Sequence, residues 1–263
     1  LSLTLTGRGK DEKRIPMCGI PFHASEGYVS KLVQRGHKVA ICEQIESDED
    51  ESKGPTKREV VRIITPGTVQ FNTVLVESDT NYLAALVKHG KNFGLSFIDI
   101  STGEFKCEVF SSFDHVLNEI ARIDPKEILI SEGFSETIPK KTVVSFIPYQ
   151  INQAADYLKK YFNVKDLKVF EIHDYQVAFP AMVGILEYVE FTQKGKVDQI
   201  NSCKPAKIAE VCKLDEGVLK HLDLFSKGGL FDFLNYTKTS MGSRLLKQWL
   251  KYPLIEINDI YSR

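Results

Sequence analysis

Three cations near residue 60 have the type and position best suited to a chemical role in this 263-residue chain. Lys53 and Lys57 precede the β-branched run REVVRIIT, which is predicted to be a strand, and Arg62 lies within it. Arginine and lysine bind phosphates through charge and hydrogen bonds, which gives affinity for nucleic acid without sequence preference. A solvated surface cation is the alternative for each residue, and the two roles are about equally balanced.

Asp99 is the residue best placed for metal-dependent phosphodiester cleavage. It lies in the apolar run FIDIS, which predicts a strand. Two-metal cleavage needs several carboxylates that hold ions about 4 Å apart. Glu104, Glu127 and Glu132 are expected at strand ends or turns, so we expect Asp99 to accept hydrogen bonds from its own turn instead. His23 has no nucleophile or acid at triad-like spacing and is expected to be structural.

Nucleotide and metal motifs are absent from the sequence. It contains no G-x-x-x-x-G-K-[ST] phosphate loop, so we expect this chain neither to bind nor to hydrolyse ATP. The five cysteines (Cys18, Cys42, Cys107, Cys203 and Cys212) are scattered without a C-x-x-C pair. Their odd number and wide spacing favour reduced cytoplasmic thiols over a disulfide framework or a zinc site. We therefore assign no catalytic, cofactor-binding or metal-binding residue.

Composition argues against a membrane protein and leaves a polyanionic partner open. No apolar run approaches the roughly 20 residues that span a bilayer, and the start has no signal-peptide pattern. We expect a cytoplasmic chain with no membrane partner. The net charge is −1, but residues 1–68 carry 11 cationic and 10 acidic side chains, residues 69–179 carry 11 and 15, and residues 180–263 carry 12 and 10. The middle segment is therefore the least suited to lie on nucleic acid.

The elements that must position the cations lie between residues 16 and 68. Ser25 is a candidate N-cap for the apolar stripe of GYVSKLVQRG, and Gly36 can end that helix in the left-handed conformation. HKVAICEQ and REVVRIIT are predicted to be paired strands, followed by a turn at Thr65-Pro66-Gly67. The acidic run ESDEDE at residues 46–51 is expected to be a solvated loop that points away from any DNA.

Residues 82–110 predict three antiparallel strands. FDHVLNEIARI then predicts a helix, EILIS and KTVVSFIP predict strands, and NQAADYLKKYF predicts a second helix, so this segment should be a mixed α/β sheet. From Pro180 onward the sequence becomes helical. VDQINSCKPAKIAEVCKLD could be an extended crossing segment, Ser240 can cap RLLKQWL, and Pro253 ends that helix.

Several long motifs stand in the order and spacing of a known family. GIPFHA, GYVSKLVQRG, VAICEQI, SKGP and VVRIITPGT resemble the mismatch-recognition domain of bacterial MutS proteins. The middle segment resembles the MutS connector, which has a ribonuclease H-like fold. DLFS and LFDFLNYTKTSMGSRLLKQWLKYPL resemble the opening of the MutS helical core, with one departure at Ser240, where the family usually reads TPMGSR.

The resemblance implies a multidomain α/β plus α fold. Residues 1–68 would form the C-terminal part of the small mixed α/β recognition domain, residues 69–179 the connector, and residues 180–263 the start of the all-helical core. The same resemblance implies that Arg8 and Arg58 approach the DNA backbone and that Met17 lies near the minor groove. Lys53, Lys57 and Arg62 remain candidates from charge and position alone.

The partners implied by the family are mismatched double-stranded DNA and MutL, the latter through the connector. The family's Phe-x-Glu wedge, clamp and ATPase domain, which binds ATP and Mg²⁺, are expected outside these residues of a homodimeric parent. A ribonuclease H-like metal-dependent nuclease is the alternative from another class. A scaffold whose connector only relays contacts is a third possibility.

Overall fold

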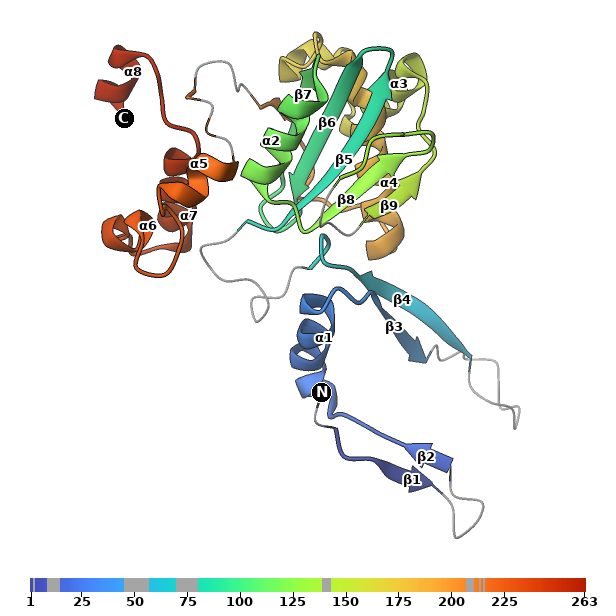
Figure 1. The fold of residues 1–263 in the computed structure, drawn as a ribbon. Helices are drawn as coiled ribbons and strands as arrows, with labels where there is room; N and C mark the ends of the chain where they lie inside the picture. Colours follow the sequence, from blue (N-terminus) through green and yellow to red (C-terminus); the bar gives the residue numbers. More distant parts are fainter. Residues whose placement is uncertain are drawn as a thin grey trace.

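The computed structural model describes residues 1, 3–8, 15–44, 57–69, 80–138, 143–206, 211, 212, 214 and 216–263. The acidic run at residues 46–51 and Lys53 lie outside these described residues. Figure 1 shows a central sheet covered by helices, with two small antiparallel strand pairs on one side and a group of helices on another. The mixed α/β plus α class predicted from the sequence is confirmed.

The chain begins with a short two-stranded ribbon. Strand β1 (Thr6–Arg8) pairs antiparallel with β2 (Ile15–Met17), so that Thr6 lies opposite Met17 and Arg8 lies opposite Ile15. The Thr6 hydroxyl also donates to the Met17 carbonyl at 2.8 Å. All three side chains of β2 are exposed, so one whole strand of this ribbon is open to a partner.

The next unit combines one helix with two strands. After the 3₁₀ turn η2 (Phe22–Ala24), helix α1 (Ser25–Gln34) leads to β3 (Val39–Gln44), which pairs antiparallel with β4 (Arg58–Ile64). We call residues 25–44 and 57–69 the N-terminal unit. Its core is small, because only Val29, Val33, Ile64 and Val69 are buried together among its described residues.

The predicted N-cap of α1 is wrong, and the predicted helix end is confirmed. The η2 turn runs directly into the helix, so Ser25 is already helical and its hydroxyl donates to the Phe22 carbonyl at 2.6 Å. The N-cap position falls to Ala24, which has no capping side chain. At the other end Gly36 adopts a positive φ of 83° and its amide donates to the Val33 carbonyl.

A six-stranded sheet in the order β10-β7-β6-β5-β8-β9 forms the centre of the molecule. Strands β5 (Tyr82–His89), β6 (Asn92–Asp99) and β7 (Glu104–Phe110) form the predicted antiparallel meander. Strands β8 (Glu127–Ser131) and β9 (Val143–Phe146) extend it in parallel beyond β5. The two-residue strand β10 (Lys204–Pro205) adds to β7 in parallel, so the mixed sheet predicted for this segment is confirmed.

Helices cover both faces of this sheet. Helix α2 (Phe113–Ile123) packs on one face, while α3 (Ile151–Phe162) and α4 (Phe179–Gln193) pack on the other (Figure 1). Strand β5 alternates between them: Leu83, Ala85 and Val87 face α3 and α4, and Ala84 and Leu86 face α2. We call residues 80–138 and 143–206 the connector body.

Helix α4 belongs to the connector body, although residues from 180 onward are assigned to the helical segment on sequence grounds. Ten of its residues are buried, on every side of the helix, and Pro180 occupies its first turn as expected. A helix that is apolar all round is typical of a core element. In the structure the α/β body therefore extends past residue 200, to β10.

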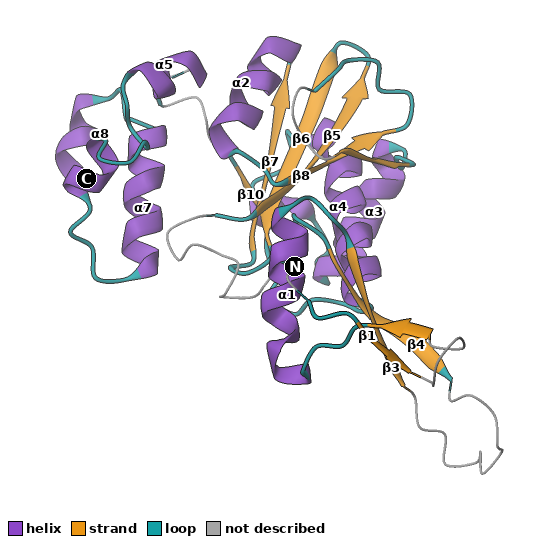
Figure 2. Cartoon of the chain, turned by 60° about the horizontal axis from the view of Figure 1, so that its bottom comes forward, coloured by secondary structure: helices purple, strands orange, loops and turns teal. Residues whose placement is uncertain are grey.

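Four helices lie among the described residues after the connector body, on the side of that body where α2 lies (Figure 2). They are α5 (Glu216–His221), α6 (Leu230–Leu234), α7 (Ser240–Lys251) and α8 (Ile257–Ser262). The predicted cap of α7 is displaced by one residue, because Thr239 is the extended residue whose hydroxyl accepts from the Gly242 amide at 3.1 Å. None of the helices among the described residues is long and apolar enough to cross a bilayer.

Candidate nucleic-acid interface and the contacts that hold it

The β1–β2 ribbon carries two of the residues proposed for DNA contact. Arg8 ends β1 opposite Ile15, and Met17 ends β2 opposite Thr6, so the two occupy opposite ends of the ribbon. Half of the Met17 surface and about two thirds of the Ile15 surface are exposed, 50% and 68% respectively. Exposed apolar side chains such as those of Ile15 and Met17 are suited to contacts in a minor groove.

Arg58 and Lys57 lie together at the start of β4. Arg58 is exposed and pairs with Gln44 at the far end of the β3–β4 ladder. The Lys57 ammonium forms an ion pair with Glu59 Oε1 at 2.6 Å, and this hydrogen bond raises the pKa of Lys57. Both lysine and glutamate are well exposed, so the pair is weak. A phosphate could therefore compete with Glu59 for Lys57.

Arg62 faces the connector body. Its Nε donates to Gln193 Oε1 of α4 at 3.1 Å, and the side chain is half-buried. Burial lowers the pKa of the Arg62 guanidinium, and the nearby Glu26 carboxylate opposes that change. The bond to Gln193 holds the Arg62 side chain toward α4. The structure brings Arg58 and Lys57 together, and it places Arg62 apart from them.

The junction between the N-terminal unit and the connector body is built on Glu127, whose side chain is fully buried. Oε2 accepts from the Thr65 hydroxyl at 2.5 Å and from the Gly67 amide at 3.3 Å. Oε1 accepts from the Tyr188 hydroxyl at 2.8 Å and lies 3.1 Å from the Lys38 ammonium. Burial, and then the Glu127 charge, raise the pKa of Tyr188, which keeps its proton for this bond.

The turn at residues 65–68 is shaped to fit against Glu127. The hydroxyls of Thr65 and Thr68 lie 3.0 Å apart, and the Thr68 amide donates to the Thr65 carbonyl at 3.1 Å, so the turn closes on itself. A Cβ atom at Gly67 would stand 3.0 Å from Glu127 Cβ and 3.0 Å from Leu83 Cδ1. A side chain at residue 67 would press on the connector body, which favours glycine there.

Sequence reasoning missed this junction. It assigns Thr65 and Gly67 to a turn and treats Glu127 only as a remote metal-ligand candidate. One signal was present in the sequence, since EILIS is an apolar strand that opens with a carboxylate. A charge at the start of a buried strand needs partners, but nothing local identifies them.

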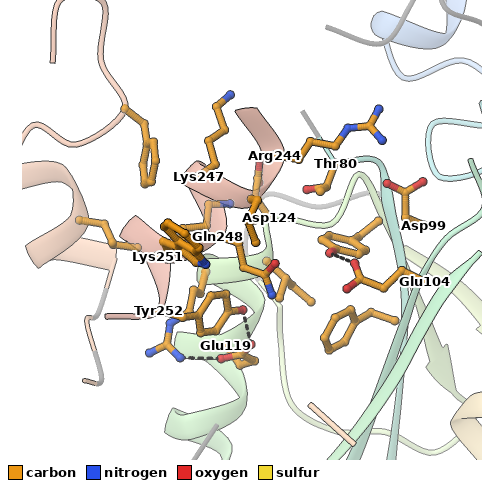
Figure 3. Close-up of a pocket in the computed structure, with 18 of the residues that line it drawn as sticks. Thr80, Asp99, Glu104, Glu119, Asp124, Arg244, Lys247, Gln248, Lys251 and Tyr252 are labelled. Carbon is orange, nitrogen blue, oxygen red and sulfur yellow. Dashed lines mark hydrogen bonds and ion pairs between the residues drawn. The ribbon is translucent and has the colours of Figure 1, made fainter. Parts of the chain in front are cut away.

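The connector body meets the helical segment through a second buried carboxylate, Glu119 of α2 (Figure 3). Arg122 Nη1 donates to Glu119 Oε2 at 3.0 Å, and the Tyr252 hydroxyl donates to Oε1 at 2.8 Å. Arg122 also stacks over the Tyr252 ring and donates to the Leu214 carbonyl at 3.2 Å. Burial raises the pKa of Glu119 despite the opposing Arg122 charge. These bonds anchor the end of α7 to α2.

A cavity of about 1060 Å³ lies between the connector body and α7. Figure 3 shows carboxylates on its connector wall and cations on its α7 wall. The carboxylates are Asp99, Glu104, Glu119 and Asp124, which share the connector wall with Lys106, Arg122 and Lys126, and the α7 wall carries Arg244, Lys247 and Lys251. A lining in which both charges are mixed does not select a ligand of one charge.

Asp99 behaves as the sequence predicts. Its Oδ1 accepts from the Ser101 amide at 2.9 Å and hydroxyl at 2.6 Å, and Oδ2 accepts from the Asn81 amide at 3.2 Å. The carboxylate thus closes its own turn. Within the described ranges no group of three His, Cys, Asp or Glu side chains is arranged to hold a metal ion. Glu104 instead bonds Tyr82 and Lys106, and Glu127 serves the junction.

Comparison with known proteins gives one consistent result along the chain. Models of MutS domain I, MutS domain II and MutS domain III match residues 1–73, 81–201 and 217–263. The chain is 38% identical over 282 aligned residues to the DNA mismatch repair protein MutS of Syntrophobacter fumaroxidans and 39% identical over 280 to that of Halothermothrix orenii. Both alignments cover all of this chain but 32% and 31% of the relatives, so it spans about a third of their length.

Proposed function

Because this chain belongs to the MutS family, we propose that it supplies the DNA-holding and connecting parts of a DNA mismatch repair sensor. The observation that supports this most strongly is the order of three MutS domains along one chain, together with alignments that cover all of this chain and about a third of proteins of that name. The substrate would be mismatched double-stranded DNA. The chain itself would perform no catalysis.

In this proposal the cations hold the DNA backbone while the duplex bends. Arg8, Lys57 and Arg58 are the described residues suited to phosphates, with Lys53 and Arg62 as further candidates, and Met17 would lie near the minor groove. A mispaired step is easier to kink and unstack than a matched one, so bending the duplex costs less free energy at a mismatch and binding there is tighter. Backbone contacts of this kind add affinity without reading sequence.

The nucleotide-dependent steps would belong to other parts of a longer parent. ATP and Mg²⁺ need a phosphate loop that these 263 residues do not supply. We propose that the parent is a cytoplasmic homodimeric ATPase, and that its nucleotide state reaches MutL through the connector body. The acidic balance of residues 69–179 suits a protein partner better than nucleic acid. The nuclease alternative has no supporting carboxylate cluster within the described residues.

Fluorescence anisotropy on matched and G·T-mismatched duplexes at two salt concentrations tests the proposed DNA contacts. Arg58→Ala should weaken binding to both duplexes and lower the slope of log affinity against log salt by about 1, because one phosphate contact is lost. Lys91→Ala is the matched control, since it removes one exposed cation from the β5–β6 turn of the connector body. Equal effects of the two substitutions would show that Arg58 contributes only general charge.

A further inference from the structure

The N-terminal unit and the connector body do not share an apolar core within the described residues. The buried cluster of the N-terminal unit contains Val29, Val33, Ile64 and Val69, with no member from the connector body. The two apolar clusters of the connector body contain no residue before Tyr82. Apolar burial is non-directional, and here it stabilises each part separately. Strand β4 packs against α4, and the directional contacts between the two parts can set the angle at which it does so.

Three polar contacts at the junction converge on one carboxylate, and the bonds Arg62–Gln193, Lys38–Tyr188 and Asn81–Val69 cross the junction beside them. Three of the four groups that bond or pair with Glu127 come from the N-terminal unit, namely the Lys38 ammonium, the Thr65 hydroxyl and the Gly67 amide. Only the Tyr188 hydroxyl comes from the connector body. Each carboxylate oxygen accepts two partners, so the acceptor capacity of the group is filled. When the N-terminal unit leaves, three of these four partners leave with it.

We propose that Glu127 is the positioning residue that fixes the orientation of the N-terminal unit, and hence of Arg58 and the other cations of β4, on the connector body. Two of the four partners restrict how the hydrogen bonds to Glu127 can be arranged. Lys38 and the Gly67 amide can only donate, and they lie on different oxygens of Glu127. A buried carboxylate that loses such partners is strongly disfavoured. The N-terminal unit therefore keeps the orientation in which all four groups contact Glu127.

Glu127→Gln distinguishes this role from simple packing. Glutamine has nearly the same shape, but its amide NH₂ must face either Lys38 or the Gly67 amide, and each is a donor. In either rotamer the glutamine NH₂ faces another hydrogen-bond donor, and neither group can accept. Glu132→Gln is the matched control, because Glu132 directly follows β8, is exposed, and loses the same charge.

Distances between two spin labels report the orientation directly. The labels are placed at Gln34→Cys in α1 and Asn152→Cys in α3, both exposed, after the exposed Cys18, Cys42 and Cys212 are replaced by serine. We expect one narrow distance distribution for the parent chain and for Glu132→Gln. We expect Glu127→Gln to broaden it or add a second peak. An unchanged distribution in Glu127→Gln would overturn the proposal.

Lys38 gives an independent test, since its side chain is 42% exposed and its replacement does not threaten the connector fold. Lys38→Met should broaden the distance distribution as Glu127→Gln does. Lys38→Arg should keep the narrow distribution of the parent chain, because it returns a cation to Glu127. In the Glu127→Gln background Lys38→Met should add little. If Lys38→Met broadened the distance distribution as much in the Glu127→Gln background as in the parent chain, the two residues would act separately and the assignment would be refuted.

Hydrogen exchange locates the change. The Thr68 amide, which closes the turn against Glu127, should exchange about tenfold faster or more in Glu127→Gln, because a charged hydrogen bond is lost from the docked state. The Leu95 amide in β6 should keep its rate, since β6 lies at the centre of the connector sheet. Equal acceleration at both amides would mean general destabilisation and would count against a positioning role. No DNA is present, so this result is separable from failure of the proposed DNA contacts.

Discussion

Glu108 of β7 gives a quantitative test of the electrostatics of the connector body. Its Oε2 is buried and has no hydrogen-bond partner among the described residues. Burial raises the pKa of Glu108 from 4.5 to about 7, and the nearby Glu119 charge acts in the same direction. The substitution Glu108→Gln removes this titration and keeps the shape of the side chain.

The sign of the effect follows from the two pKa values. Below pH 4.5 Glu108 is protonated in both the folded and the unfolded chain, so ionisation costs nothing. Between pH 4.5 and about 7 only the unfolded chain loses the proton, so stability falls as the pH rises, and it levels off above pH 7. At about 1.36 kcal/mol per pKa unit the ceiling is about 3.4 kcal/mol. Partial contact with water reduces our expectation to about 1–2 kcal/mol.

Urea denaturation at pH 5, 6, 7 and 8 measures this difference. The free energy of unfolding of Glu108→Gln, relative to the parent chain, should rise between pH 5 and 7 and then stay constant. Glu132→Gln serves as control for the loss of one carboxylate, because Glu132 is exposed. A constant offset between Glu108→Gln and the parent at all four pH values would refute the reasoning, since the buried carboxyl would then not titrate differently in the folded state.

Three further outcomes are expected. Gly94→Ala should destabilise the connector body by about 1–3 kcal/mol or more in urea denaturation, because its Cβ would stand 2.3 Å from the Val177 carbonyl oxygen; Gly27→Ala, in open space on α1, should be neutral or stabilising. Tyr252→Phe should weaken the anchoring of α7 by about 1.5–3 kcal/mol, through loss of its bond to the buried Glu119, and faster hydrogen exchange at the Tyr252 amide would report it. Isothermal calorimetry with ATP and Mg²⁺ should show no saturable binding to this chain, and a saturable isotherm would contradict that expectation.

The strands of the connector body could be predicted from the sequence, because each strand is marked by its own apolar run and by the turns beside it. The meander of β5 to β7 follows from apolar runs separated by turns, and α2 ends where Asp124 adopts the left-handed conformation before Pro125. The β1–β2 ribbon was harder, since strands of three residues carry too little periodicity to predict a pairing. The first half of α4 is apolar throughout, but a helical pattern alone does not say which sheet the helix covers.

The candidate DNA contacts also differ in how far the local sequence could predict them. Charge and position identified Lys57 as a candidate, the family resemblance identified Arg58, and both are exposed at one end of β4. They did not predict that Arg62 turns to Gln193, because that partner lies in α4, far along the chain. The junction at Glu127 depends on contacts from Lys38, Thr65 and Gly67 on one side and Tyr188 on the other. Such distant partners leave no mark on local periodicity.

The short strand β10 has a consequence for synthesis of the chain. It pairs in parallel with β7, so that Pro205 lies beside Cys107 and the Ala206 amide bonds the Cys107 carbonyl. Every other strand of that sheet has been translated long before β10 leaves the ribosome. Until then β7 presents an unpaired edge, and such edges are prone to pair with other chains. The part of the β7 edge at Lys106 and Cys107 therefore stays open to other chains until residues 204 and 205 have emerged.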